Sequence, residues 1–182
     1  VKEGDEWVLN GNKLWITNGG IAQFFTVFAK TGGQADRGNM TAFIVTRDMP
    51  GVTIGPHEDK MGIRASSTTT VHFDNVRVPA SYVLGEVGKG FKVAMKILNS
   101  GRTGLGGGTV GGMKKLISLA TKQAKDRVQF GKPIAEFGLV KQKIGQMVVD
   151  CYVTESAVNM VNAIIDSGSQ EYAVEAVITK VF

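Results

Sequence analysis

Trp15 and Thr17 lie two positions apart at the end of a run that alternates as β-strands do, Lys13–Thr17. Side chains at this spacing point to the same face of a sheet. An indole on that face can stack on a ring system, and a hydroxyl can donate a hydrogen bond to a ring nitrogen or carbonyl. The pair is what a flat redox cofactor needs, although a Trp that covers a core and a Thr with high strand propensity produce the same pattern.

An antiparallel β unit is expected to position this pair. Trp7–Leu9 and Lys13–Thr17 alternate as strands do, and Asn10-Gly11 between them is the strongest short hairpin signal. Further period-two runs follow, at Phe24–Phe28, Met40–Val45, Val52–Ile54, Thr69–Phe73 and Val76–Val78. Asp74-Asn75 separates the last two as a turn signal. We therefore expect an antiparallel sheet or barrel over residues 1–83.

From Gly90 onward the apolar period becomes helical, and we expect helices over residues 84–182. One apolar stripe comprises Phe91, Ala94, Met95 and Leu98, and a second comprises Leu116, Leu119, Ala120 and Ala124. After a loop at Arg127–Phe137, residues 139–165 predict a long helix that ends at Asp166-Ser-Gly168, and another begins near Gln170. The fold class is α+β, with an antiparallel sheet or barrel followed by an up-and-down helical bundle.

Composition excludes several classes of protein. With 182 residues, 43% of them hydrophobic, the chain can build one or two cores and is not disordered. Its net charge of +5 comes from basic residues scattered singly, which favours a small polyanionic ligand over nucleic acid. The single Cys151 excludes a disulfide framework, and His57 and His72 have no ligand-spaced partner, so we predict no metal.

Four motifs occur in an order and spacing that resembles the acyl-CoA dehydrogenase family, and most closely its very-long-chain branch. They are Trp15-Ile-Thr-Asn-Gly-Gly20, Leu84-Gly-Glu-Val-Gly-Lys-Gly-Phe-Lys-Val-Ala-Met95, Asn99-Ser-Gly-Arg102 and Arg127-Val-Gln-Phe-Gly131. The resemblance covers essentially the whole chain. It implies the latter part of the middle β domain and the first helices of the C-terminal four-helix domain, in a fragment truncated at both ends.

The resemblance also implies two binding regions. FAD would contact Trp15, Ile16 and Thr17, and Arg127, Gln129 and Phe130 would hold FAD that is bound mainly by a neighbouring subunit. Asn99, Ser100, Gly101 and Arg102 would lie beside the thioester and pantetheine arm of the substrate. Phe137 and Gly138 stand where related enzymes have a His-Gln pair. Because Arg102 has no charged partner four residues away, we expect it to be buried against an anion.

No catalytic residue is assigned within the chain. Some relatives place their catalytic Glu where this chain has Gly101, and the more usual Glu would lie beyond Phe182. The implied reaction is α,β-dehydrogenation of a long-chain acyl-CoA, with a carboxylate removing the α-proton and the β-hydride passing to the flavin. The resemblance also implies a mitochondrial location, at the matrix or inner-membrane periphery. It implies a dimer or tetramer, with electron-transfer flavoprotein as a partner. Membrane contact would come only through regions outside the chain. The alternative is a non-catalytic respiratory-chain assembly or scaffold protein on the same fold.

Seven glycines lie within residues 101–112: Gly101, Gly104, Gly106, Gly107, Gly108, Gly111 and Gly112. Gly106–Gly111 formally matches the dinucleotide fingerprint, but that motif requires a preceding strand and the preceding period is helical. In a helix each glycine costs about 0.5–1 kcal/mol relative to alanine. The glycines therefore serve a close helix crossing, a plain loop, or space for a long acyl chain, which the resemblance favours.

Overall fold

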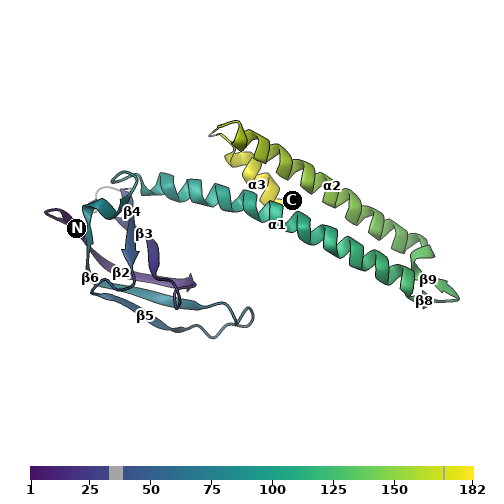
Figure 1. Cartoon of the computed structure of the whole chain (residues 1–182), viewed down its shortest axis with the longest axis horizontal. Helices are drawn as coiled ribbons and strands as arrows, with labels where there is room; N and C mark the ends of the chain where they lie inside the picture. Colours follow the sequence, from purple (N-terminus) through teal and green to yellow (C-terminus); the bar gives the residue numbers. More distant parts are fainter. Residues whose placement is uncertain (33–38, 170) are drawn as a thin grey trace. The chain divides into compact units, whose positions relative to one another are not determined.

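The structure is a computed structural model that describes residues 1–32, 39–169 and 171–182 (Figure 1). It divides into two compact units, Val1–Met95 and Lys96–Phe182. The first unit holds β1 (Lys2–Glu3), β2 (Glu6–Thr17), β3 (Phe24–Lys30), β4 (Met40–Thr46), β5 (Val52–His57), β6 (Thr68–Pro79), the 3₁₀ turn η1 (Ala80–Tyr82) and β7 (Val83–Leu84). The predicted boundary between residues 83 and 84 stays a prediction.

The strands form two antiparallel sheets, with the orders β1-β2-β6-β5 and β3-β4-β7. Both sheets contribute to one apolar core, to which β2 supplies Trp7 and Leu9, β4 supplies Phe43 and β6 supplies Val76. The Trp7 and Phe43 rings meet edge to face, with their centroids 5.6 Å apart. The expected antiparallel architecture is confirmed, and the strands of the described residues form open sheets without closing into a barrel.

The predicted hairpin at Asn10-Gly11 is wrong, because β2 runs unbroken from Glu6 to Thr17. Both of its halves pair with β6, and the register shifts between Leu9 and Gly11. The predicted turn at Asp74-Asn75 is likewise part of β6. The side-chain oxygen of Asn10 accepts a hydrogen bond from the backbone amide of Asn75 at 2.8 Å. The two turn-like segments therefore lie opposite each other, at the irregularity in the pairing of β2 with β6. Burial of the flanking apolar residues against the core overrides both local turn preferences.

The second unit is built on the long helix α1 (Gly90–Asp126), which begins in the first unit. It also contains the hairpin β8 (Val128–Gln129) and β9 (Lys132–Pro133), the 3₁₀ turn η2 (Ile134–Glu136), and the helices α2 (Gly138–Asp166) and α3 (Ala173–Val181). Figure 1 shows α2 running back along the latter part of α1. Lys114 of α1 forms an ion pair with Glu155 of α2, as expected for adjacent helices. The predicted helical unit is therefore confirmed.

Two helix predictions can be compared with these bounds. The helix predicted for residues 139–165 is α2, and Gly168 adopts φ +83° just after its end, as a C-terminal stop residue does. Gln170, where the next helix was predicted to begin, lies outside the described residues. Leu116 and Leu119 of the second α1 stripe are exposed, while Ala124 is buried. Within the described residues, no helix has the length and hydropathy needed to cross a membrane.

Candidate functional site

Trp15 lies at an irregularity of β2 that the sequence did not reveal. Lys13 pairs with Val71 and Ile16 pairs with Thr69, so β2 carries one extra residue between these pairs. Trp15 has φ +53°, a conformation in which a bulky side chain is strained by about 1–3 kcal/mol. Its indole is nevertheless 71% exposed. Strain at an exposed aromatic residue persists only where the surroundings fix it, and such positions concentrate at functional sites.

Thr17 is exposed like Trp15, and Ile16 between them is half-buried and packs against the core. Trp15 and Thr17 thus lie on either side of Ile16, the third predicted cofactor contact, which anchors the strand. Although the bulge interrupts the simple two-residue period before Trp15, the indole and the hydroxyl are both left accessible at the end of β2. An accessible ring and donor this close in the chain can contact one planar ligand.

The loop that follows Thr17 is tightly held. The amides of Ile21 and Ala22 donate to the carbonyl of Asn18 at 3.0 and 2.8 Å, and Asn18 itself has φ +63°. A Cβ atom added at Gly19 would lie 2.4 Å from the Thr69 hydroxyl, and one at Gly20 would lie 2.6 Å from the Ser67 hydroxyl. Glycine at positions 19 and 20 is therefore favoured by the close approach of the neighbouring segment.

Arg127 follows the last residue of α1 and leads into a tight hairpin. Phe130 and Gly131 form its two-residue turn with φ +53° and +78°, as in a type I′ turn. The Ile134 amide donates to the Arg127 carbonyl at 2.8 Å and closes the hairpin. The guanidinium of Arg127 is exposed, and no hydrogen bond or ion pair engages it within the described residues. It is therefore available to an anion such as a phosphate.

The aromatic residues of this hairpin pack on each other. Phe130 is 92% exposed, yet its ring meets the Phe137 ring edge to face at 6.2 Å. The Lys132 ammonium lies 4.7 Å from the centroid of the same Phe137 ring. Gln129 is exposed and donates to the Val128 carbonyl. Phe137 thus supports the shape of the hairpin that follows Arg127.

The predicted substrate segment, Asn99–Arg102, lies in α1. Arg102 is half-buried and donates from Nη1 to the Asn99 side-chain oxygen at 2.7 Å. The expectation that Arg102 is buried against an anion is therefore not met by any carboxylate of the described residues, because its partner is a neutral amide one turn earlier. Ser100 and Gly101 are exposed, and Asn99 is half-buried. The segment offers polar groups for binding and no acid or base.

The glycine stretch is helical, so the plain-loop alternative is wrong. A Cβ atom added at Gly106 would lie 3.0 Å from Cγ2 of Val158 in α2 and 3.5 Å from Cβ of Thr179 in α3. Added at Gly104, Gly107 or any other glycine from Gly101 to Gly112, it would meet no described atom within 4 Å. Gly106 therefore serves a close helix crossing, while the other glycines present a bare helix surface.

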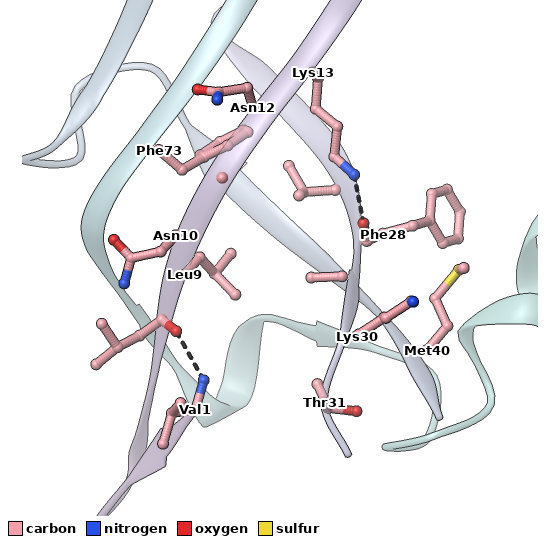
Figure 2. Close-up of a pocket in the computed structure, with 14 residues that line it drawn as sticks. Val1, Leu9, Asn10, Asn12, Lys13, Phe28, Lys30, Thr31, Met40 and Phe73 are labelled. Carbon is pink, nitrogen blue, oxygen red and sulfur yellow. Dashed lines mark hydrogen bonds between the residues drawn. The ribbon is translucent and has the colours of Figure 1, made fainter. Parts of the chain in front are cut away.

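A groove of about 520 Å³ opens elsewhere, between β2 and β3 (Figure 2). The Lys13 ammonium donates to the Phe28 carbonyl at 2.8 Å and links the two strands across it. Asn10 and Asn12 also line the groove, whereas none of the predicted cofactor or substrate residues does. The predicted residues therefore lie on three segments, at the end of β2, within α1 and in the hairpin after α1, and this groove is separate from them.

Sequence reasoning missed the residues that support the Trp15 segment. Arg47 donates from Nη1 to the Gly20 carbonyl at 3.0 Å and to the Ala22 carbonyl at 3.4 Å. The Ser67 hydroxyl accepts a hydrogen bond from the Gly20 amide at 3.2 Å. These contacts join residues 27 and 47 positions apart, and no local pattern marks either partner.

Comparison with known proteins places both units in one family. Residues 1–76 match the acyl-CoA dehydrogenase middle domain, and residues 88–182 match the acyl-CoA dehydrogenase C-terminal domain. The chain is 52% identical to the very long-chain specific acyl-CoA dehydrogenase, mitochondrial, of Bos taurus over 98% of its own length, and it spans 28% of that relative.

Two solved structures share the fold. Butyryl-CoA dehydrogenase from Megasphaera elsdenii matches with a TM-score of 0.89 and 38% identity, covering 98% of this chain and 46% of that one. An acyl-CoA dehydrogenase complexed with FAD from Bacillus anthracis matches with a TM-score of 0.77 and 39% identity, covering 98% and 31%. The matched regions together include the Trp15, Arg102 and Arg127 segments, so the fold and the sequence motifs point to the same family. The chain belongs to the acyl-CoA dehydrogenase family.

Proposed function

We propose that the protein is an FAD-dependent dehydrogenase that introduces an α,β double bond into long-chain acyl-CoA thioesters. The observation that carries the proposal is the Trp15–Thr17 segment, in which a strained backbone holds an indole and a hydroxyl exposed at the end of β2. Membership of the acyl-CoA dehydrogenase family and 52% identity to a very long-chain enzyme support the choice of reaction and substrate.

The residues present fit FAD. The Trp15 indole would stack on the flavin ring, and the Thr17 hydroxyl would donate to a ring nitrogen or carbonyl. Ile16, anchored in the core, would keep both in place. The unpaired Arg127 fork suits the pyrophosphate, with Gln129 and the exposed Phe130 beside it. When bound, FAD supplies the acceptor for the substrate β-hydride.

Asn99–Arg102 would bind the acyl-CoA thioester and its pantetheine arm. The Asn99–Arg102 hydrogen bond fixes the guanidinium on the helix, and exposed Ser100 and Gly101 leave the adjoining surface open. Because this segment has no carboxylate, its residues bind and orient the substrate and do not remove the α-proton. The bare surface at Gly104 and Gly107 would accommodate the acyl chain.

The wider setting is proposed from the relatives. The bovine relative is named as a mitochondrial enzyme, which supports a mitochondrial location at the matrix or inner-membrane periphery. Electron-transfer flavoprotein would reoxidise the flavin, and a homo-oligomer would bring the Arg127 hairpin of one subunit to the FAD of another. A non-catalytic assembly role on the same fold is the alternative, and it would not require reduction of a bound flavin by acyl-CoA.

Replacement of Thr17 by valine in the purified full-length protein tests the proposal. The variant keeps the shape and loses the donor, so the visible absorption of bound flavin and its anaerobic reduction by a long-chain acyl-CoA should both change. Thr53→Val, at an exposed threonine of β5, is the matched control and should change neither. If Thr17→Val bound and reduced its flavin like the parent, Thr17 would not contact the cofactor. A parent protein that bound FAD without being reduced by acyl-CoA would favour the assembly role.

A further inference from the structure

Arg47 immediately follows β4 and holds the loop that begins after Thr17 through three hydrogen bonds. Its side chain donates from Nη1 to the carbonyls of Gly20 and Ala22, at 3.0 and 3.4 Å. Its backbone amide donates to the carbonyl of Gln23 at 2.8 Å. One residue thus fixes the loop near its middle and at its end.

Ser67 holds the same loop through different atoms. Its carbonyl accepts a hydrogen bond from the Asn18 amide at 2.7 Å, and its hydroxyl accepts one from the Gly20 amide at 3.2 Å. Gly20 is therefore engaged by Ser67 through its N–H and by Arg47 through its C=O. The loop is fixed by two residues that are distant from it in sequence, and it leads directly from the strained Trp15.

The guanidinium of the half-buried Arg47 donates its hydrogen bonds to backbone carbonyls. No carboxylate of the described residues lies within ion-pair distance of its guanidinium. Charge-assisted hydrogen bonds of this kind are stronger than neutral ones, and the rigid guanidinium fixes the direction of both. Because the Arg47 guanidinium forms no ion pair within the described residues, its hydrogen bonds act on the loop alone.

We propose that Arg47 is a positioning residue for the face formed by Trp15 and Thr17. It acts by holding the Gly20 and Ala22 carbonyls, which keeps the preceding bulge in the strained conformation that exposes the indole. The proposal rests on the proposed function, because this face is the one assigned to the flavin. Ser67 acts in the same way from the other side of the loop.

The two tryptophans of the chain allow a test that does not depend on flavin. Trp7 is 5% exposed in the core and Trp15 is 71% exposed, so 5-fluorotryptophan labelling gives one ¹⁹F NMR signal for each environment. In the flavin-free purified protein, Arg47→Ala should shift or broaden the Trp15 signal and leave the Trp7 signal unchanged. Arg47→Lys keeps the positive charge but lacks the planar guanidinium, so its Trp15 signal should lie between those of Arg47→Ala and the parent.

Flavin binding supplies the second measurement. Loss of a charge-assisted contact that orders the site should weaken FAD binding by roughly tenfold in Arg47→Ala. Arg77→Ala, which removes surface ion pairs to Glu3 and Glu6 in the same unit, is the control and should change neither measurement. Ser67→Ala removes the hydroxyl that accepts from the Gly20 amide and also lies 3.5 Å from Nδ1 of His57, and it tests the loop again if Arg47→Ala does not fold.

The outcomes separate the two proposals. A Trp15 signal that stayed at its parent position in Arg47→Ala, or in Ser67→Ala if the first variant is unfolded, would overturn the positioning role. A Trp15 signal that moved while FAD affinity stayed unchanged would support positioning and would contradict the assignment of Trp15 to the flavin. Changes in both measurements, reversed in part by Arg47→Lys, are the expected result.

Discussion

Alanine substitutions at Gly106 and Gly107 should have different effects on stability, although the two glycines are adjacent in α1. A Cβ atom at Gly106 would lie 3.0 Å from Cγ2 of Val158, a buried residue of α2, and 3.5 Å from Cβ of Thr179 in α3. A Cβ atom at Gly107 would meet nothing within 4 Å among the described residues. The pair therefore isolates the effect of the helix crossing.

The size of the difference follows from two terms. Replacing a helical glycine with alanine stabilises a helix by about 1 kcal/mol, and this term is common to both variants. Overpacking costs about 1–3 kcal/mol, and a single methyl group that needs its neighbour to move by a few tenths of an ångström belongs in the lower part of that range. Only Gly106→Ala incurs this cost. We expect it to be about 1–2 kcal/mol less stable than Gly107→Ala.

Thermal and urea unfolding of the purified protein measure this difference. Gly107→Ala should melt above the parent, and Gly106→Ala should melt below Gly107→Ala by roughly 2–8 °C, taking about 2–4 °C per kcal/mol for a protein of this size. The parent serves as the reference for the shared propensity term. Equal shifts for the two variants would refute the assignment of Gly106 to a close crossing, because the added methyl group would then meet no resistance.

Three further outcomes are expected. Gly107→Leu should lower kcat/KM for long acyl-CoAs more than for short ones with little change in Tm, whereas equal losses would contradict an acyl path along the bare helix surface. Lys13→Met should destabilise the protein by about 1–2 kcal/mol and speed amide exchange in β3, because the Phe28 carbonyl loses its charged donor; unchanged exchange would oppose this. A hydrogen bond from the Thr46 side chain lowers the pKa of the exposed Asp48 carboxyl, so its small stabilising effect is present above the unfolded-state pKa and is lost as pH falls through the folded-state value. An NMR titration should show the Asp48 pKa rising in Thr46→Val, and an unmoved midpoint would exclude that bond.

The sequence by itself determined the class of fold, the family and the end of α2. Period-two and helical patterns are local, so they predicted a sheet unit followed by long helices without knowledge of any contact. The α2 stop at Asp166-Ser-Gly168 is local too, because Gly168 readily adopts the left-handed conformation found there. The four family motifs could be recognised for the same reason, since each is a short run of defined residues.

The tertiary structure alone decided how those segments meet. Asn10-Gly11 favours a hairpin locally, yet β2 stays extended because Leu9 and its neighbours pair with β6 and pack in the core. Likewise, the glycines of α1 are alike in sequence, and only the approach of α2 and α3 distinguishes Gly106. The support of the Trp15 segment by Arg47 depends on a contact between residues 27 positions apart, which the packing of the β unit brings together and no local pattern encodes.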